Sequence, residues 1–356
     1  MNVPFYKVPI SEKEINTVIK TVKSGWLTFG KQTELFEEKF AKYVGAPYCV
    51  MVDNCTAAIY LACEYYGRGM PLEYRQIMEV DVPSLTCAAT ALGPIHAGFS
   101  ICFRDIVDGD DFLIMDSSDS NPYIPVHYAG KEKKILKKSE VVVEDCAHRI
   151  IRDGFNGNIQ AYSFYATKNL TTGEGGMIAC NTKKEADWFK KARLYGNNKA
   201  IYERKKMYQS GKNFWEFESE FTGWKANPTD IAASIGLAQL SRLDELNAER
   251  KRIADRYNLS LGLTNDRFPW HLYPILVNER DKFMYYMKDN GVHCAVHFPL
   301  LHKMKAFKKY PKTSLKNTER IYKHIVSLPL YPYMTIKEQD YVIKLTLNWM
   351  KKYGRA

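Results

Sequence analysis

The chain has 356 residues, 46% of them hydrophobic and 26% charged, a balance that excludes a disordered chain, a collagen-like fibre and a disulfide-dependent miniprotein. Lysine and arginine outnumber aspartate and glutamate by 51 to 40. This excess is spread thinly, and no DNA-binding motif accompanies it, so the charge alone does not predict a nucleic-acid partner. No apolar run approaches the roughly 18 residues of a membrane span, and the first residues do not resemble a secretory signal.

Short apolar runs alternate with helix-like segments over roughly the first 250 residues. The runs predict strands at 48–52, 76–82, 99–103, 123–127 and 141–143. Helices are expected at 56–66, at 86–97 and, as one long element, at 228–246, where Pro228 suits the first turn. Because the runs are continuously apolar, we expect a sheet that is covered on both faces and largely parallel, within an α/β fold.

The pattern changes near residue 250. A continuing helix is expected at 250–257 and a loop at 264–269, followed by a strand at 271–277, a helix at 280–290 and a strand at 293–298. We interpret residues 1–248 as a large α/β domain and residues 249–356 as a smaller C-terminal domain.

The chain has eight cysteines but no Cys-x-x-Cys pair, which argues against zinc-ribbon and thioredoxin-like sites. We expect free, mostly buried thiols and a reducing compartment, hence a cytoplasmic location.

Lys168 lies between two short apolar runs, in a segment that is rich in hydroxyl groups and ends in a glycine-rich turn. Partial burial disfavours the charged ammonium form, which makes a lysine amine nucleophilic. Gly173, Gly175 and Gly176 would let the backbone pass closely beside a bound ring. The alternative is a surface lysine in a glycine-rich hairpin.

Two further segments place polar groups at the ends of predicted strands. Asp145 follows the run at 141–143, where ligands sit in open α/β sheets, and His148 comes three residues later. The segment from Val52 to Ala58 joins a strand to a helix, and the helix N–H groups with the Thr56 hydroxyl could cradle a phosphate. Each segment also fits simple capping or turn formation. Taken together, they supply an imine-forming lysine, an acid for a pyridinium nitrogen and a phosphate seat, which is the set that pyridoxal 5'-phosphate requires.

Ordered motifs along nearly the whole chain make it resemble the DegT/DnrJ/EryC1/StrS family of pyridoxal-phosphate-dependent nucleotide-sugar aminotransferases. The motifs are Gly25-Trp26-Leu27-Thr28-Phe29-Gly30 with Phe36-Glu37, Asn54 to Ala58, Pro125 to Gly130, Glu144 to His148, Ser163 to Gly176, Ala192 to Gly196, Gly223 to Leu237, His297 to His302 and Ser327 to Pro332.

The resemblance implies the aspartate-aminotransferase-like type I fold, with a large mixed-sheet domain and a smaller α+β C-terminal domain. It implies that Lys168 is the Schiff-base lysine and that Asp145 keeps the pyridine nitrogen protonated. His148 matches a position beside the ring, and Thr56 and Ser163 match phosphate contacts. Lys225 matches a position that reaches the phosphate from a neighbouring subunit, which implies a homodimer with shared active sites.

The remaining expected site residues include departures from the family pattern. Asn54 and Cys55 replace the usual Ser-Gly at the cofactor, and Cys87 stands where an aromatic residue usually stacks on the ring. Substrate contacts are expected at Trp26, Thr28, Arg193 and His297. We expect no metal ligand set and no nucleic-acid or membrane partner.

The implied reaction moves an amino group from L-glutamate to a nucleotide-linked keto sugar, most simply a 4-keto-6-deoxy sugar, for glycan biosynthesis. One alternative is a sugar dehydratase of the same fold, although such enzymes carry histidine where this chain has Lys168. Another is a cofactor-binding regulatory or scaffold protein that has lost turnover, and a third is a basic nucleic-acid-binding protein.

Overall fold

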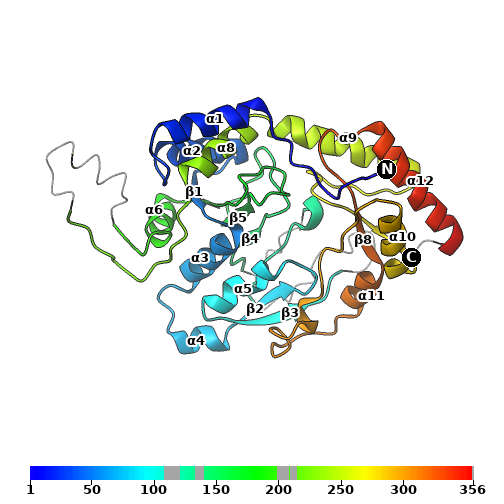
Figure 1. The fold of residues 1–356 in the computed structure, drawn as a ribbon. Helices are drawn as coiled ribbons and strands as arrows, with labels where there is room; N and C mark the ends of the chain where they lie inside the picture. Colours follow the sequence, from blue (N-terminus) through cyan, green and yellow to red (C-terminus); the bar gives the residue numbers. More distant parts are fainter. Residues whose placement is uncertain (108–120, 133–139, 199–207, 209–214, 355–356) are drawn as a thin grey trace. The chain divides into compact units, whose positions relative to one another are not determined.

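The computed structural model describes residues 1–107, 121–132, 140–198, 208 and 215–354 (Figure 1). The chain forms two compact units. The first contains Met1–Pro9, Pro71–Val141 and Arg242–Ala356, and the second contains Ile10–Met70 and Val142–Ser241. The chain therefore passes between the units several times, whereas the boundary predicted after residue 248 cuts it once. That boundary stays a prediction.

The second unit is built on a four-stranded sheet. Its strands are β1 (Tyr48–Val52), β4 (Glu144–Asp145), β5 (Gln160–Ser163) and β6 (Gly176–Cys180), in the order β1-β6-β5-β4. β6 is antiparallel to both β1 and β5, whereas β4 and β5 are parallel. The predicted α/β class and mixed sheet are confirmed, and the sheet is largely parallel as expected, since β1, β4 and β5 share one direction and β6 runs against them. Continuous apolar runs indicate that a strand is buried on both faces of its sheet, but they do not indicate the direction of the strand.

Five described helices belong to this unit. They are α1 (Glu12–Lys23), α2 (Lys31–Val44), α3 (Cys55–Gly67), α6 (Lys183–Ala192) and α8 (Asp230–Leu240). Of these, α2, α3 and α6 pack directly on the sheet. α3 packs on β5 and β6, α2 packs on β1 and α8, and α1 packs on α8, as Figure 1 shows. The rings of Phe36 and Phe40 from α2 meet Phe164 at 5.3 and 5.4 Å between centroids. These aromatic contacts form much of the core beneath the strand ends.

The first unit holds two smaller pairs of strands. β2 (Glu79–Pro83) and β3 (Ser100–Arg104) are parallel, and β7 (Tyr273–Leu276) and β8 (Ile325–Leu328) are antiparallel. Its described α-helices are α4 (Leu72–Ile77), α5 (Ala88–His96), α9 (Leu243–Leu261), α10 (Arg280–Asp289), α11 (Lys316–His324) and α12 (Ile336–Tyr353). Buried aromatic residues, including Tyr257, Trp270, Phe283 and Trp349, pack around β7 and β8.

Several predicted elements have different limits. The single helix expected over 228–246 is two helices, because the backbone leaves the helical region at Arg242 (φ −118°, ψ 3°) between α8 and α9. The strand expected at 76–82 begins only at Glu79, since α4 extends to Ile77. The runs at 123–127, 141–143 and 293–298 form isolated bridges, not strands.

All eight cysteines carry free thiols, and six of them are buried, as expected. Among the described residues, no helix is both long and apolar enough to cross a bilayer.

Candidate active site

The carboxyl ends of three strands meet at one edge of the four-stranded sheet. Because β6 is antiparallel to its two neighbours, β1, β5 and β4 all run in the same direction. Val52 at the end of β1 and Ser163 at the end of β5 both face Gly176, and Asp145 at the end of β4 pairs with Ala161. The topology thus brings together the three segments that the sequence singled out.

Helix α3 begins directly at this edge. Asn54 is its N-cap residue, and its Oδ1 accepts a hydrogen bond from the Ala57 N–H at 2.8 Å. Thr56 is half-buried in the first turn, beside the buried Cys55. A Cβ added at Gly176 would lie only 2.6 Å from the Asn54 carbonyl group and 2.8 Å from the Cys55 nitrogen. Glycine is therefore required where β6 crosses the amino end of α3.

Two buried ionisable groups lie at the end of β4 and in the turn after it. Asp145 is 4% exposed and His148 5% exposed. One Asp145 oxygen accepts a hydrogen bond from the Ala147 N–H at 3.1 Å, which fixes the carboxylate in the turn after the strand. Burial strongly raises the pKa of the neighbouring Cys146 thiol, and the nearby groups that raise it further include Asp145 and Cys55. The Asp145 carboxylate and the Cys55 thiol at the start of α3 therefore both lie within electrostatic range of the Cys146 thiol.

Lys168 lies in the loop that joins β5 to β6. The loop is closed by backbone hydrogen bonds of 2.9 Å from Phe164 to Gly175 and from Thr172 to Phe164. The Lys168 N–H donates to the Tyr165 carbonyl at 2.9 Å, which forms a tight turn. Lys168 itself is half-buried. The structure does not support a fully exposed hairpin lysine.

Lys225 lies near the end of β1. The Asp53 N–H donates to the Ala226 carbonyl at 2.9 Å, which ties the segment carrying Lys225 to the strand end. Burial raises the pKa of the Asp53 carboxyl, which nearby Lys225 lowers and Glu174 raises. Lys225 is exposed and donates a hydrogen bond to the Asn227 side chain. It is therefore accessible beside a partly buried acid.

Asp230 fixes the loop that carries Trp26 and Thr28, because its N–H donates to the Leu27 carbonyl at 3.0 Å. The sequence pattern presented this residue only as part of a helix start. Thr28 forms a bridge with Thr229, and Trp26 lines a pocket of about 340 Å³ with Lys20, Lys31 and several hydroxyl groups. The buried Asp230 carboxylate accepts hydrogen bonds at 2.7–3.2 Å from three N–H groups at the start of α2. An acid at the start of α8 signals the N-terminus of α8 itself, and no local pattern links Asp230 to α2, because Gly30 and Asp230 are 200 positions apart.

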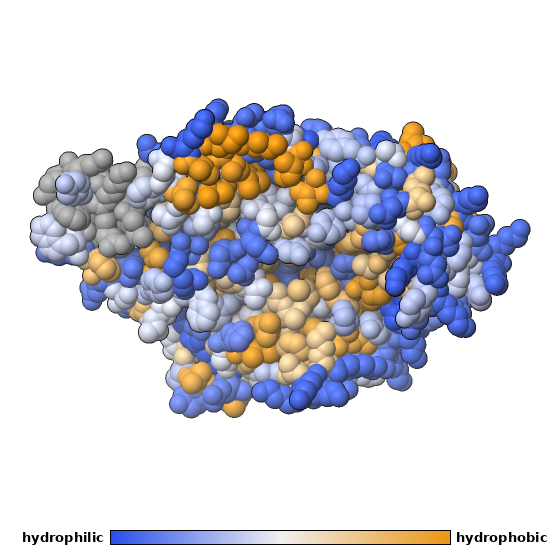
Figure 2. Space-filling view, viewed as in Figure 1, coloured by the Kyte–Doolittle hydropathy of each residue, from blue (hydrophilic) through white to orange (hydrophobic). Residues whose placement is uncertain are grey.

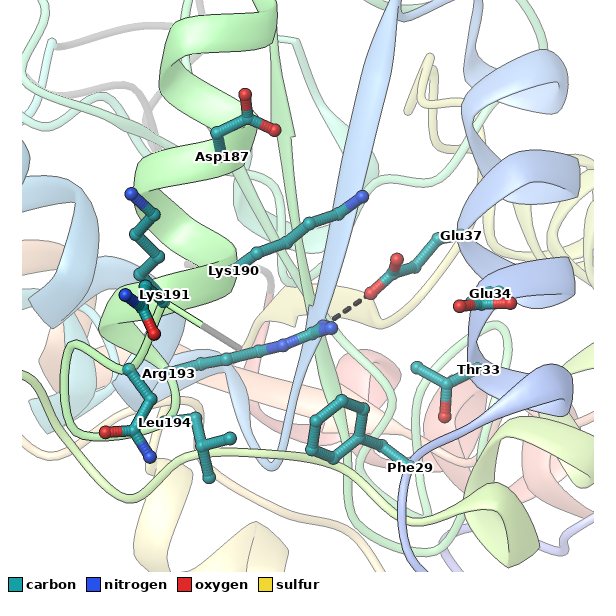
Figure 3. Close-up of a pocket in the computed structure, with 11 residues that line it drawn as sticks. Phe29, Thr33, Glu34, Glu37, Asp187, Lys190, Lys191, Arg193 and Leu194 are labelled. Carbon is teal, nitrogen blue, oxygen red and sulfur yellow. Dashed lines mark hydrogen bonds and ion pairs between the residues drawn. The ribbon is translucent and has the colours of Figure 1, made fainter. Parts of the chain in front are cut away.

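Arg193 occupies a different environment from the other expected substrate residues. Its guanidinium is buried, pairs with Glu37 at 2.5 Å and donates to the Met51 carbonyl at 2.6 Å. Figure 3 shows it crossing a pocket between α6 and α2, close to the Phe29 ring. The described contacts are structural ones, and the substrate role of Arg193 stays a prediction. Glu37 was visible in the sequence only as part of a motif.

Cys87 and His297 belong to the first unit, whereas the residues above belong to the second. Cys87 is exposed and directly precedes α5. The His297 ring accepts or donates a hydrogen bond at 3.0 Å with the Ser327 hydroxyl and stacks on Phe5. Their roles at the cofactor ring and the substrate stay predictions.

The second unit has groups that suit each part of pyridoxal phosphate. A half-buried amine fits its carbonyl carbon, a buried carboxylate fits its ring nitrogen, and the amino end of α3 fits its phosphate. Gly176 leaves space against that helix end where any side chain would intrude. The residues present therefore fit this cofactor.

Comparison with known proteins also supports pyridoxal phosphate as the cofactor. The model of the DegT/DnrJ/EryC1/StrS aminotransferase family matches residues 9–346. The chain is 34% identical to the spore coat polysaccharide biosynthesis protein SpsC of Bacillus subtilis, with 97% of each chain covered. It superposes on Spr1654 of Streptococcus pneumoniae, a sugar aminotransferase by its name, solved in PMP and PLP forms. For the PMP form the TM-score is 0.85 at 26% identity, covering 99% of this chain and 100% of the other. Helicobacter pylori PseC shares the fold, with a TM-score of 0.87 at 19% identity over 99% and 100% of the two chains.

Proposed function

The chain belongs to the DegT/DnrJ/EryC1/StrS aminotransferase family, and we propose that it moves an amino group from L-glutamate to a keto sugar linked to a nucleoside diphosphate. It has the type I fold and is a sugar aminotransferase that uses pyridoxal phosphate. The acceptor is a 4-keto-6-deoxy sugar, and the product is an amino sugar for glycan biosynthesis. The name of SpsC, which refers to polysaccharide biosynthesis, supports this use of the product.

The observation that carries the proposal is the meeting of Lys168, Asp145 and the amino end of α3 at one sheet edge. When bound, pyridoxal phosphate supplies a ring that withdraws electrons from the reacting carbon. Asp145 holds a proton on the ring nitrogen, which maintains that withdrawal. The N–H groups of α3 with Thr56 and Ser163 hold the phosphate. Asn54, Cys55 and His148 line the rest of the cofactor site.

Lys168 holds the cofactor between turnovers and moves the proton during each half-reaction. Its amine takes the proton from the Cα of the amino donor as a general base and then returns a proton as a general acid. A half-buried position suits this role, because the amine is partly desolvated and still reaches the substrate. Trp26, Thr28, Arg193 and His297 are the residues that we assign to the substrate.

The active enzyme is a homodimer in which Lys225 of one copy reaches the phosphate held by the other. The exposed position of Lys225 near the end of β1 supports this arrangement. Cys87 contacts the ring in place of an aromatic residue. We place the enzyme in the cytoplasm, which agrees with eight free thiols.

The test is an absorbance spectrum of the purified protein with pyridoxal phosphate. We expect a band near ~420 nm that L-glutamate moves to ~330 nm, and that the variant Lys168→Ala lacks. Lys183→Ala, at an exposed lysine on α6, is the matched control and keeps both bands. Amination of nucleotide-linked keto sugars then separates transfer from dehydration. A wild-type band that glutamate never shifts would favour a cofactor-binding protein without turnover.

A further inference from the structure

The pocket of about 340 Å³ that contains Trp26 is formed by the end of α1, the loop after it and the start of α2. Four of its residues lie on one face of α1 and its C-cap at the i, i+3, i+4, i+7 spacing, and they are Thr17, Lys20, Thr21 and Ser24. Figure 2 shows apolar side chains gathered where Figure 1 places α1, with hydrophilic ones along their border. The pocket uses a face of α1 that carries only polar residues.

Two lysines give the pocket positive charge. Lys20 and Lys31 line it and are exposed. Neither forms an ion pair or a hydrogen bond with another residue in the part of the chain that the structure describes. The side-chain amide of Gln32, at the same wall, has no hydrogen-bond partner among those residues either. The pocket therefore offers N–H donors and two positive charges to a ligand with anionic oxygens.

Asp230 is the acid of this pocket, and its charge is already bound by the protein. The carboxylate is 3% exposed. It accepts hydrogen bonds at 2.7–3.2 Å from the N–H groups of Gly30, Gln32 and Thr33, and one at 2.8 Å from the Thr33 hydroxyl. Because the first turn of α2 holds this charge, Asp230 does not neutralise the two lysines.

The hydroxyl groups of the pocket are acceptors toward a ligand. Thr17, Thr21 and Ser24 each donate to a backbone carbonyl three or four residues earlier, at 2.7–3.0 Å. A hydroxyl has one proton, so these oxygens keep only lone pairs for a ligand. The Trp26 indole N–H likewise donates to the Phe29 carbonyl at 3.3 Å, which leaves the ring to pack against a ligand.

This combination of groups selects a ligand that has both anionic oxygens and hydroxyl donors. A diphosphate joined to a ribose carries both, whereas a free inorganic anion would leave the hydroxyl acceptors unused. Pockets for small molecules usually measure roughly 300–1,000 Å³. A volume of about 340 Å³ is at the small end of this range, so it suits one part of a nucleotide-linked sugar better than the whole molecule.

We propose that this pocket binds the ribose-diphosphate part of the nucleotide-linked sugar, with Lys20 and Lys31 on the diphosphate and the hydroxyl oxygens of α1 on the ribose. The proposal rests on the proposed function and names the residues that recognise the nucleotide. A backbone bridge joins the pocket loop to the segment of Lys225, since Thr28 pairs with Thr229. L-glutamate carries no diphosphate, so its half-reaction does not depend on the two lysines.

The first test measures binding of inorganic pyrophosphate to the enzyme loaded with pyridoxal phosphate, by calorimetry. At roughly 0.15 M salt, exposed charges more than about 8 Å apart are largely screened. We expect Lys20→Ala and Lys31→Ala each to raise the dissociation constant by about 10-fold, equivalent to about 1.4 kcal/mol. Lys31→Arg keeps the charge and most of the affinity. Lys23→Ala is the matched control, because Lys23 is an exposed lysine in the last turn of α1 outside the pocket.

The second test separates the ribose from the diphosphate. Thr17→Val removes a hydroxyl acceptor at nearly constant volume, and we expect it to weaken binding of uridine diphosphate by about 3-fold, as for one modest hydrogen bond. Binding of pyrophosphate stays at the wild-type value. Circular dichroism establishes that the variants are folded. Equal affinity of Thr17→Val and the wild type for uridine diphosphate would refute the ribose contact.

The third test asks whether the pocket serves the substrate. In the amination assay, pyrophosphate raises the KM for the nucleotide-linked keto sugar and leaves kcat unchanged. Inhibition that lowers kcat alone would make the pocket an effector site and overturn the assignment.

These outcomes separate the pocket assignment from the proposed function. The assignment is wrong if both alanine variants bind pyrophosphate like the wild type, or if Lys23→Ala weakens binding equally. The ~420 nm band and its response to L-glutamate test the cofactor chemistry, and we expect the lysine variants to leave both unchanged. A band that glutamate never moves would refute the proposed transfer, while the pyrophosphate titration would still test the pocket.

Discussion

Replacing Gly176 by alanine tests whether the amino end of α3 and the start of β6 together form the binding site for the cofactor phosphate. The new Cβ would meet the backbone of Asn54 at 2.6 Å, about 0.8 Å closer than the 3.4 Å at which ordinary van der Waals contact begins. The obstructing atoms are backbone atoms at a helix cap, so no side-chain rotation relieves the contact. Either β6 or α3 has to move, and overpacking of this kind costs about 1–3 kcal/mol of unfolding free energy.

The same movement should weaken cofactor binding, because the N–H groups of α3 leave their position beside Ser163. We expect Gly176→Ala to raise the pyridoxal phosphate dissociation constant by roughly 10-fold or more, in line with about 1.4 kcal/mol per factor of ten. Urea unfolding gives the stability and titration of the ~420 nm band gives the affinity. Gly157→Ala is the control, since its Cβ would meet nothing within 4 Å although its positive φ adds backbone strain. If Gly176→Ala binds the cofactor like the wild type, the proposed phosphate seat is wrong.

Substitutions at three further positions probe buried ionisable groups. Asp230→Ala leaves N–H groups at the start of α2 without their acceptor and should cost about 3–4 kcal/mol in urea unfolding, while Asp230→Asn retains an acceptor and costs less. Arg193→Ala leaves Glu37 buried without its partner and should cost about 3–5 kcal/mol, so a loss below 1 kcal/mol would contradict the buried ion pair. Burial lowers the pKa of His302 below 6.5, so the unfolded chain takes up a proton first and stability falls as the pH drops below about 6.5. His302→Gln should flatten this dependence between pH 7.5 and 5.5.

The sequence predicts the strand ends of the candidate site well because their signals are local. The apolar run of β1 stops at Val52 and the capping residue Asn54 follows at once, as the structure confirms. Asp145 and Lys168 likewise stand beside short apolar runs. Such transitions depend on neighbours in the sequence, and a single chain displays them directly.

Strand direction and helix breaks depend on contacts between distant residues, and the sequence predicted neither the reversal of β6 nor the break between α8 and α9. β6 lies between β1 and β5 and runs antiparallel to both, although its apolar run does not differ from that of a parallel strand. No glycine or proline marks the break between Leu240 and Leu243. The break is made by the backbone of Arg242, assisted by the Ser241 hydroxyl, which donates to the Ala238 carbonyl at 2.6 Å.

The buried pair of Glu37 and Arg193 illustrates how a residue expected at a substrate can serve the scaffold. β1 is the outer strand of the described four-stranded sheet, so part of its backbone has no strand partner. Glu37 accepts a hydrogen bond from the Met51 N–H at 2.9 Å, and Arg193 donates to the Met51 carbonyl at 2.6 Å. The two side chains thus satisfy both polar groups of one edge residue and neutralise each other. Because Glu37 and Arg193 are 156 positions apart in the chain, no local pattern reveals the pair. It holds β1 at Met51, three residues before the cap of α3, so the stability of this edge and the position of the proposed cofactor site depend on the same ion pair.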